Sequence, residues 1–331
     1  MMRKLLLFCL LAQVALPAFA VRRVTVAQLE RLVAENHAKS DAKIAPRFYD
    51  LELTERLSPA KLAALEAALP GPESRRSLVA LADQAAFLDP PPAEIPSAAP
   101  PGPDAQRRMM ASAVDYAAKT MHQLPNLFAT RDTIHFEDSP AVQKEIGEEN
   151  VSGTFTPYQP LHPVSRSTVA VLYRDGQEVV DAPNSAHPTS SSLTTKGEFG
   201  PILATVLGDA AQGNLAWSHW EQGPAGLQAV FRFVVPRPDS HYQVEFCCID
   251  DAVFRRFSGY HGELTLDPAT GTILRLTLIA DLAKSDPVVK ANIMVEYGPI
   301  ELGSRTYICP VKSVSLFLAP EQLPGVIRVT G

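Results

Sequence analysis

The segment from Leu227 to Phe317 most constrains the fold, because apolar and polar residues alternate in several short runs along it. The first run places one set of side chains on one side, with Gln228 and Arg232 on the other; the set is Leu227, Ala229, Phe231, Phe233 and Val235. A period of two residues is typical of a β-strand with one buried face. The pattern returns in residues 242–249. The segment therefore predicts an antiparallel meander that buries one face and exposes the other.

The first twenty residues have the form of a secretory signal peptide. Arg3 and Lys4 precede an apolar run over residues 5–16, and a small-x-small site ends at Ala20. The sequence therefore predicts cleavage after Ala20 and a secreted or periplasmic protein. The apolar run is too short to span a membrane, and no later segment has about 18 uncharged apolar residues, so we expect no transmembrane segment.

Charge limits the classes of partner. Cleavage would remove Arg3 and Lys4, which lowers the number of Lys and Arg residues from 30 to 28 against 36 Asp and Glu, a net charge of −8. An acidic chain of this kind disfavours nucleic acid and anionic membrane surfaces as partners.

The chain after the signal peptide (residues 1–20) divides into three parts. Residues 21–88 carry apolar residues at helical spacing and predict a helical region. Residues 89–103 are rich in proline and predict a semi-rigid linker. Residues 104–331 begin with a helix and continue as strands, with a short helix expected near Pro201. We therefore predict an α+β protein, in which the helical region precedes a strongly curved antiparallel β-sheet, a half-barrel with a helix on its concave face.

Several short stretches within residues 105–318 resemble stretches in known protein families. They are residues 123–130 (Gln-Leu-Pro-Asn-Leu-Phe-Ala-Thr), 197–200 (Gly-Glu-Phe-Gly), 240–242 (Ser-His-Tyr), 260–264 (Tyr-His-Gly-Glu-Leu), 267–271 (Asp-Pro-Ala-Thr-Gly), 297–299 (Tyr-Gly-Pro) and 307–310 (Tyr-Ile-Cys-Pro). In them the chain resembles a family of uncharacterised secreted bacterial proteins. The unit around residues 267–271 is also similar to periplasmic half-barrel proteins, namely lipoprotein carriers and sigma-E regulators of the RseB type. This second resemblance implies a curved sheet that holds acyl chains or peptides.

The first resemblance also concerns the end of the chain. Its members usually continue into one more strand after the segment that corresponds to residues 310–313 (Pro-Val-Lys-Ser). The short tail that ends at Gly331 leads us to expect that this last strand is missing or altered here.

The apolar strand faces supply the candidate ligand site. We predict an apolar cavity lined by Phe231, Phe233, Tyr242, Val244, Phe246, Leu264, Leu274 and Leu276. A packed core is the alternative and the commoner role of such residues. The leading function is a non-catalytic binding protein for a lipid, an acyl chain or a partner segment. The alternative is an envelope interaction or structural module, with the helical region as the docking surface.

Patterns typical of catalysis, metals and cofactors are absent from the sequence. The eight histidines are scattered, and no His-Glu-x-x-His, Gly-x-Ser-x-Gly or phosphate-binding loop occurs. We therefore assign no catalytic residue, no metal and no cofactor. One enzymatic alternative is a hydrolase that uses His261 and Glu263, which lie on the same side of one strand. Residues 218–221 (Ser-His-Trp-Glu) offer similar groups, and we interpret them as a strand with a core tryptophan.

Three cysteines remain once cleavage removes Cys9. They are Cys247, Cys248 and Cys309, in a compartment that favours disulfides. Neighbouring strand residues face opposite sides, and Cys248 follows the apolar face of its strand. We therefore predict a disulfide between Cys248 and Cys309, with Cys247 as the other possible partner and three reduced, buried thiols as the alternative.

Overall fold

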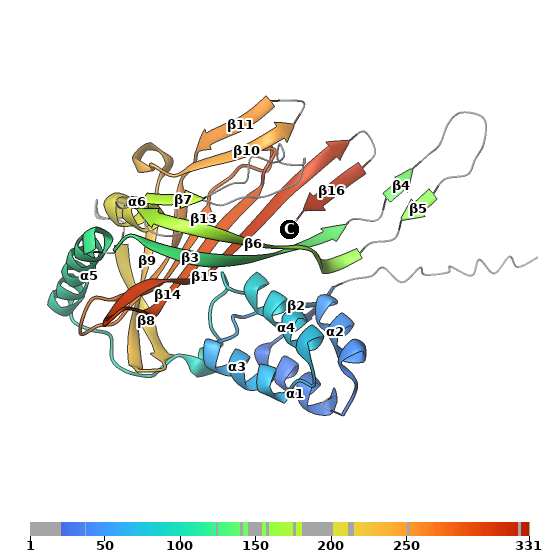
Figure 1. The fold of residues 1–331 in the computed structure, drawn as a ribbon, viewed down its shortest axis with the longest axis horizontal. Coiled ribbons are helices and arrows are strands. Elements are labelled where there is room, and N and C mark those ends of the chain that lie inside the picture. Colours follow the sequence, from blue (N-terminus) through green and yellow to red (C-terminus); the bar gives the residue numbers. More distant parts are fainter. Residues whose placement is uncertain are drawn as a thin grey trace, which may run out of the picture.

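The computed structural model describes most of the chain beyond the predicted signal peptide. The described residues are 21–36, 38–123, 125–139, 142–144, 154–156, 159–174, 177–180, 201–210, 215–249, 252–323 and 326–330. Within them the protein is α+β, and its sheets are mostly antiparallel (Figure 1). The signal peptide and its cleavage site lie outside these residues, so both stay predictions.

Four helices near the N-terminus pack around one apolar core: α1 (Val26–Asn36), α2 (Asp41–Tyr49), α3 (Pro59–Ala68) and α4 (Pro72–Gln84). A proline occupies the first turn of α3 and of α4, where its missing N–H costs nothing. We expected the helical pattern to continue to Leu57, and this is wrong. Residues 51–53 instead form β2 (Leu51–Leu53), which pairs in parallel with β1 (Arg22–Val24) and buries both of its leucines in the core.

The proline-rich segment 89–103 contacts the large sheet as well as joining the helices to it. It contains one turn of 3-10 helix, η1 (Pro92–Glu94). Asp89 forms an ion pair with Arg232, and the Trp220 Nε1–H donates to the Ala99 carbonyl over 2.9 Å. The segment then enters α5 (Pro103–Gln123).

A seven-stranded sheet forms the centre of the molecule. Its strand order is β16-β15-β14-β13-β12-β9-β8, and every neighbouring pair is antiparallel. The strands are β8 (Leu215–Gly223), β9 (Gly226–Val235), β12 (Tyr260–Leu266), β13 (Ile273–Ala280), β14 (Lys290–Leu302), β15 (Arg305–Leu323) and β16 (Val326–Thr330). A further strand is present at the end of the chain, because β16 pairs with the end of β15, so of the two expected alternatives the missing strand is wrong.

The meander is not continuous. The chain leaves the sheet at Pro236, which cannot donate a backbone hydrogen bond, and passes through a 3-10 turn, η2 (Arg237–Asp239). The next two strands, β10 (Gln243–Ile249) and β11 (Ala252–Phe257), form a separate antiparallel hairpin. The chain then returns at Tyr260, opposite Val235, so that β9 pairs directly with β12. In Figure 1 this hairpin stands apart from the long strands.

A second sheet has the order β3-β6-β7, from β3 (Leu127–Ser139), β6 (Gln159–Arg174) and β7 (Gln177–Val180). Asp175-Gly176 is typical of a two-residue hairpin turn and predicts paired strands on either side. These strands are present as β6 and β7, although the turn lies outside the described residues. The sequence predicts only a short strand at residues 133–137, but β3 is longer and pairs with β6 along most of its length. A short pair, β4 (Val142–Lys144) and β5 (Thr154–Thr156), follows β3.

The large sheet has one apolar and one polar face. Leu264 and Leu276 belong to the core cluster, so Glu263 and Arg275, one position earlier, lie on the other face. On the apolar face pack α5 and α6 (Pro201–Ala210), which confirms a short helix at Pro201-Ile202-Leu203. We call this surface, made by β9, β12, β13 and β14, the apolar face. The other is the polar face, and the N-terminal helical region contacts it.

Candidate functional site

The eight residues predicted to line a cavity lie in different environments in the structure. Four of them, Phe231, Phe233, Leu264 and Leu276, are fully buried in the core cluster beneath α5 and α6. Tyr242 packs against this cluster and against a smaller one that contains Val244. Leu274 is half-buried outside the cluster, and the side chain of Phe246 lies outside the described residues. The four core residues thus have a structural role, and a ligand could reach them only in place of a covering helix.

Helix α6 packs on β9, the strand that carries Phe231 and Phe233. It places on the core an apolar set that recurs every three or four positions: Ile202, Leu203, Val206, Leu207 and Ala210. In the same core cluster the rings of Phe233 and Tyr260 meet edge to face at 5.9 Å, and the ring of Tyr242, which packs against the cluster, meets that of Tyr260 at 5.7 Å. The covered surface is therefore a continuous apolar area.

One buried carboxylate joins the end of α6 to the sheet. Asp209 is the only charged residue of α6 and is 3% exposed. Its carboxylate accepts hydrogen bonds from the His241 backbone N–H at 3.0 Å, from His241 Nδ1 at 2.6 Å and from the Tyr260 hydroxyl at 2.8 Å. We call these three residues the Asp209 cluster.

The hydrogen bonds keep Asp209 ionised. Burial alone would raise the pKa of this carboxyl group, but the bonds from His241 and Tyr260 outweigh burial and hold the pKa below its usual value. An ionised carboxylate can only accept, so His241 Nδ1 and the Tyr260 hydroxyl both act as donors. Burial and the neighbouring Asp209 also raise the pKa of Tyr260, which keeps its hydroxyl protonated.

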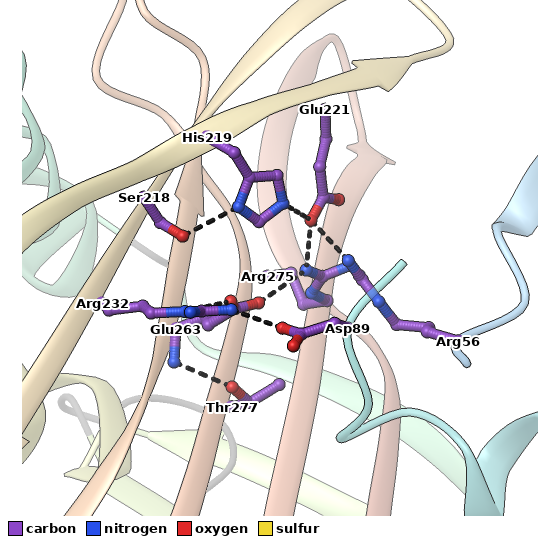
Figure 2. Close-up of polar contacts among 9 residues, drawn as sticks. All are labelled: Arg56, Asp89, Ser218, His219, Glu221, Arg232, Glu263, Arg275 and Thr277. Carbon is purple, nitrogen blue, oxygen red and sulfur yellow. Dashed lines mark hydrogen bonds and ion pairs between the residues drawn. The ribbon is translucent and has the colours of Figure 1, made fainter. Parts of the chain in front are cut away.

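On the polar face, an ion network joins the sheet to the N-terminal region (Figure 2). Arg56 and Arg275 both donate to Glu221 Oε1, and Arg232 lies between Glu263 and Asp89. A further pair, Lys312 with Asp83, bridges the same two parts. Arg56, Asp83 and Asp89 all belong to residues 21–103. The surface of the helical region that carries these groups is therefore occupied within the chain.

Three residues of β8 are linked in the order of a catalytic relay. Ser218 Oγ lies 2.8 Å from His219 Nδ1, and His219 Nε2 lies 3.1 Å from Glu221 Oε1. Burial of Glu221 is outweighed by its bonds to His219 and Arg56, which lower its pKa. The ionised Glu221 then accepts from Nε2, and Nδ1 is left to accept the Ser218 hydroxyl, as a general base would.

The arginines argue against catalysis by this relay. The same Glu221 oxygen also accepts from Arg56 and Arg275. Glu221 is therefore shared between His219 and two arginines, which makes the relay part of the ion network. We therefore assign the relay to the interface between the helical region and the sheet, which it helps to hold.

The hydrolase pair predicted from the sequence is divided between two environments. His261 Nδ1 lies 2.8 Å from Asp281 Oδ1 in an exposed contact. Glu263 belongs to the ion network, where its carboxylate accepts from Arg232 at 3.1 Å. The structure thus gives each residue a partner of its own rather than a shared substrate site.

Cys309 is a free, buried thiol, and burial raises its pKa. The side chains of Cys247 and Cys248 lie outside the described residues, so the pairing stays a prediction. Non-reducing peptide mapping tests it: a peptide that joins Cys309 to Cys248 would support the bond, and three alkylated thiols would refute it.

Sequence reasoning missed the Asp209 cluster. One signal was available, because Asp209 follows Val206 by three positions and so continues the buried row of an otherwise uncharged helix. His241 and Tyr260 lie in two of the stretches that carry the resemblance, but they come from separate parts of the chain, so the sequence did not show that both contact Asp209.

No helix in the described part of the chain is long and apolar enough to cross a membrane. The same residues contain no group of three or more His, Cys, Asp or Glu side chains placed to hold a metal ion. Comparison with known proteins found no family model, no curated protein and no solved structure that matches this chain.

Proposed function

We propose that this is a non-catalytic binding protein that takes an apolar ligand, a lipid or an acyl chain, on the apolar face of its sheet in place of α6. The observation that carries the proposal is that α6 covers the apolar face of the sheet. A ten-residue helix lies over a continuous aromatic and aliphatic surface, and its one charged side chain is its polar tie to the sheet among the described contacts.

The energetics permit an exchange of α6 for a ligand. A helix this short is marginal on its own, so packing on the sheet is what holds it. The four large apolar side chains of α6 contribute roughly 6–12 kcal/mol, at about 1.5–3 kcal/mol for each one buried. An acyl chain gains about 0.8 kcal/mol per buried methylene, so about 8–15 methylenes would offset the loss. The balance therefore favours a medium or long acyl chain over a small apolar molecule.

The rest of the proposed organisation agrees with this function. A half-barrel whose concave face carries a helix would offer one apolar surface to a ligand, and the resemblance to periplasmic lipoprotein carriers favours the same class. The helical region over residues 21–88, tied to the polar face, would leave the apolar face to the ligand. Cleavage after Ala20 would place the protein in a compartment where lipids and lipoproteins are transported.

The test is a binding titration on the full-length mature protein after removal of bound lipid. We expect a dansyl-labelled undecanoic acid to give a saturable rise in fluorescence that unlabelled palmitate reverses. Hydrogen exchange should then show faster exchange of the α6 amides in the ligand-bound protein, while the amides of β13 stay unchanged. Absence of saturable binding, or binding that leaves α6 protected, would count against the proposal.

A further inference from the structure

We infer that the ligand is a long-chain carboxylic acid, whose carboxylate takes the place of the Asp209 carboxylate at the sheet. The inference rests on the proposed function and specifies the chemical class of its ligand. In this view α6 imitates the ligand and occupies its site when the ligand is absent.

The first support is the set of donors. Three N–H or O–H groups converge on the Asp209 carboxylate, within 2.6–3.0 Å, and none of them belongs to α6. Tyr260 lies on β12, and His241 lies between η2 and β10. If α6 leaves, these donors lose their acceptor. The Tyr260 hydroxyl is fully buried, and a buried donor without a partner is costly, so a new acceptor at this place is favoured. The His241 side chain is 76% exposed, so it can donate to an incoming acceptor from the edge of the site.

The second support is the outline of α6. Asp209, Val206 and Ile202 are spaced by three and four positions and so lie in one row along the helix. The row is about 10 Å long, at about 1.5 Å per residue. It has a carboxylate at one end and hydrocarbon along the rest, all of it buried against the sheet. A fatty acid has the same sequence of groups, with a carboxylate at one end and a hydrocarbon chain after it.

The third support is the charge preference of the donors. Hydrogen bonds to a carboxylate are shorter and about twice as strong as those to a neutral acceptor. The distance of 2.6 Å from His241 Nδ1 to Asp209 is in this short range. A methyl ester or an alcohol would keep the hydrocarbon contacts but lose the charge. The site should therefore select the acid over the ester of the same chain.

The experiment compares two probes, dansyl-labelled undecanoic acid and its methyl ester, on four full-length proteins. These are the wild type, Asp209→Ala, Tyr260→Phe and the control Asp281→Asn. Asp281 also pairs with a histidine, His261, but in an exposed contact. The ratio of the two affinities is measured within each protein, so a change in folded fraction affects both probes alike.

We expect the wild type to bind the acid roughly tenfold more tightly than the ester, the effect of one hydrogen bond to a charged group. Asp209→Ala should bind the acid more tightly than the wild type, because it removes the competing carboxylate. Tyr260→Phe should reduce the preference for the acid. Asp281→Asn should leave both affinities unchanged.

The outcomes separate the inference from the proposed function. Equal binding of acid and ester, or weaker acid binding by Asp209→Ala, would overturn the inference and leave an apolar ligand in place. A preference for the acid that survives Tyr260→Phe would likewise exclude the Asp209 cluster as the site of the carboxylate. A wild type that binds neither probe would overturn both proposals.

Discussion

Replacement of Glu221 with alanine is expected to lower the free energy of unfolding by about 3–5 kcal/mol, because it leaves two buried arginines without their shared acceptor. Arg56 and Arg275 are both less than a tenth exposed, and each donates to Glu221 Oε1. The side chain of Glu221 is itself only 14% exposed, so water cannot replace the lost contact. Urea unfolding of the purified protein measures the effect.

A matched exposed pair supplies the control for this experiment. Glu245 binds Arg255 on the β10–β11 hairpin, where both side chains are more than half exposed. Removal of such a pair costs about 1 kcal/mol or less. If Glu221→Ala and Glu245→Ala changed stability equally, the ion network would not hold the helical region to the sheet.

The pH dependence of the stability difference between wild type and Glu221→Ala adds an independent check. The folded-state pKa of Glu221 is lowered, so its contribution is present above the unfolded value of about 4.3 and is lost as the pH falls through the folded value. The difference in stability between wild type and Glu221→Ala should therefore be constant near neutral pH and shrink in acid.

Replacement of Gly262 with alanine is expected to cost about 3 kcal/mol or more, at the upper end of what overpacking usually costs. A Cβ atom at this position would overlap the carbonyl oxygen of Thr277 and lie 2.8 Å from Phe233 Cζ. Both neighbours are fixed, since β12 is hydrogen-bonded on one side to β9 and on the other to β13. The protein must therefore move backbone or expel an aromatic ring from the core.

Gly208→Ala is the control, and we expect it to change stability in the opposite direction. Gly208 lies in α6, and a Cβ there would have no atom within 4 Å. Alanine favours a helix over glycine by up to about 1 kcal/mol, so Gly208→Ala should raise the melting temperature while Gly262→Ala lowers it sharply. A Gly262→Ala protein as stable as the wild type would show that the β12–β13 contact is looser than the structure has it.

The large sheet could be predicted from sequence where the alternation is strict. Within the predicted meander, apolar side chains at every second position and a following turn predict a strand at residues 260–266, and this strand matches β12. The strands β3 and β6 were predicted too short, since they carry polar residues such as Arg131 and Ser165 at many positions. Strands that are held together mainly by backbone hydrogen bonds leave little alternation of apolar and polar residues in the sequence.

The candidate site could be predicted only in part, for a related reason. Phe231 and Leu264 were recognised as apolar strand residues, and the helix that covers them was expected. Whether such residues line a cavity or a core depends on what packs against them, which periodicity does not record. The contacts of Asp209 and of Arg56 are tertiary, and each joins residues at least 30 positions apart along the chain.

The separate hairpin β10–β11 also sets the order in which the sheet can assemble. Most neighbouring strands of the sheet are joined by short turns, but β9 and β12 are separated by the whole of residues 236–259. The chain entropy of closing that segment must be lost before their pairing gains anything, which makes this the slow junction. Two local units, β8–β9 and β12–β16, can therefore form first. Since Phe231 lies opposite Leu264 across this junction, the apolar core is completed only when the two units meet.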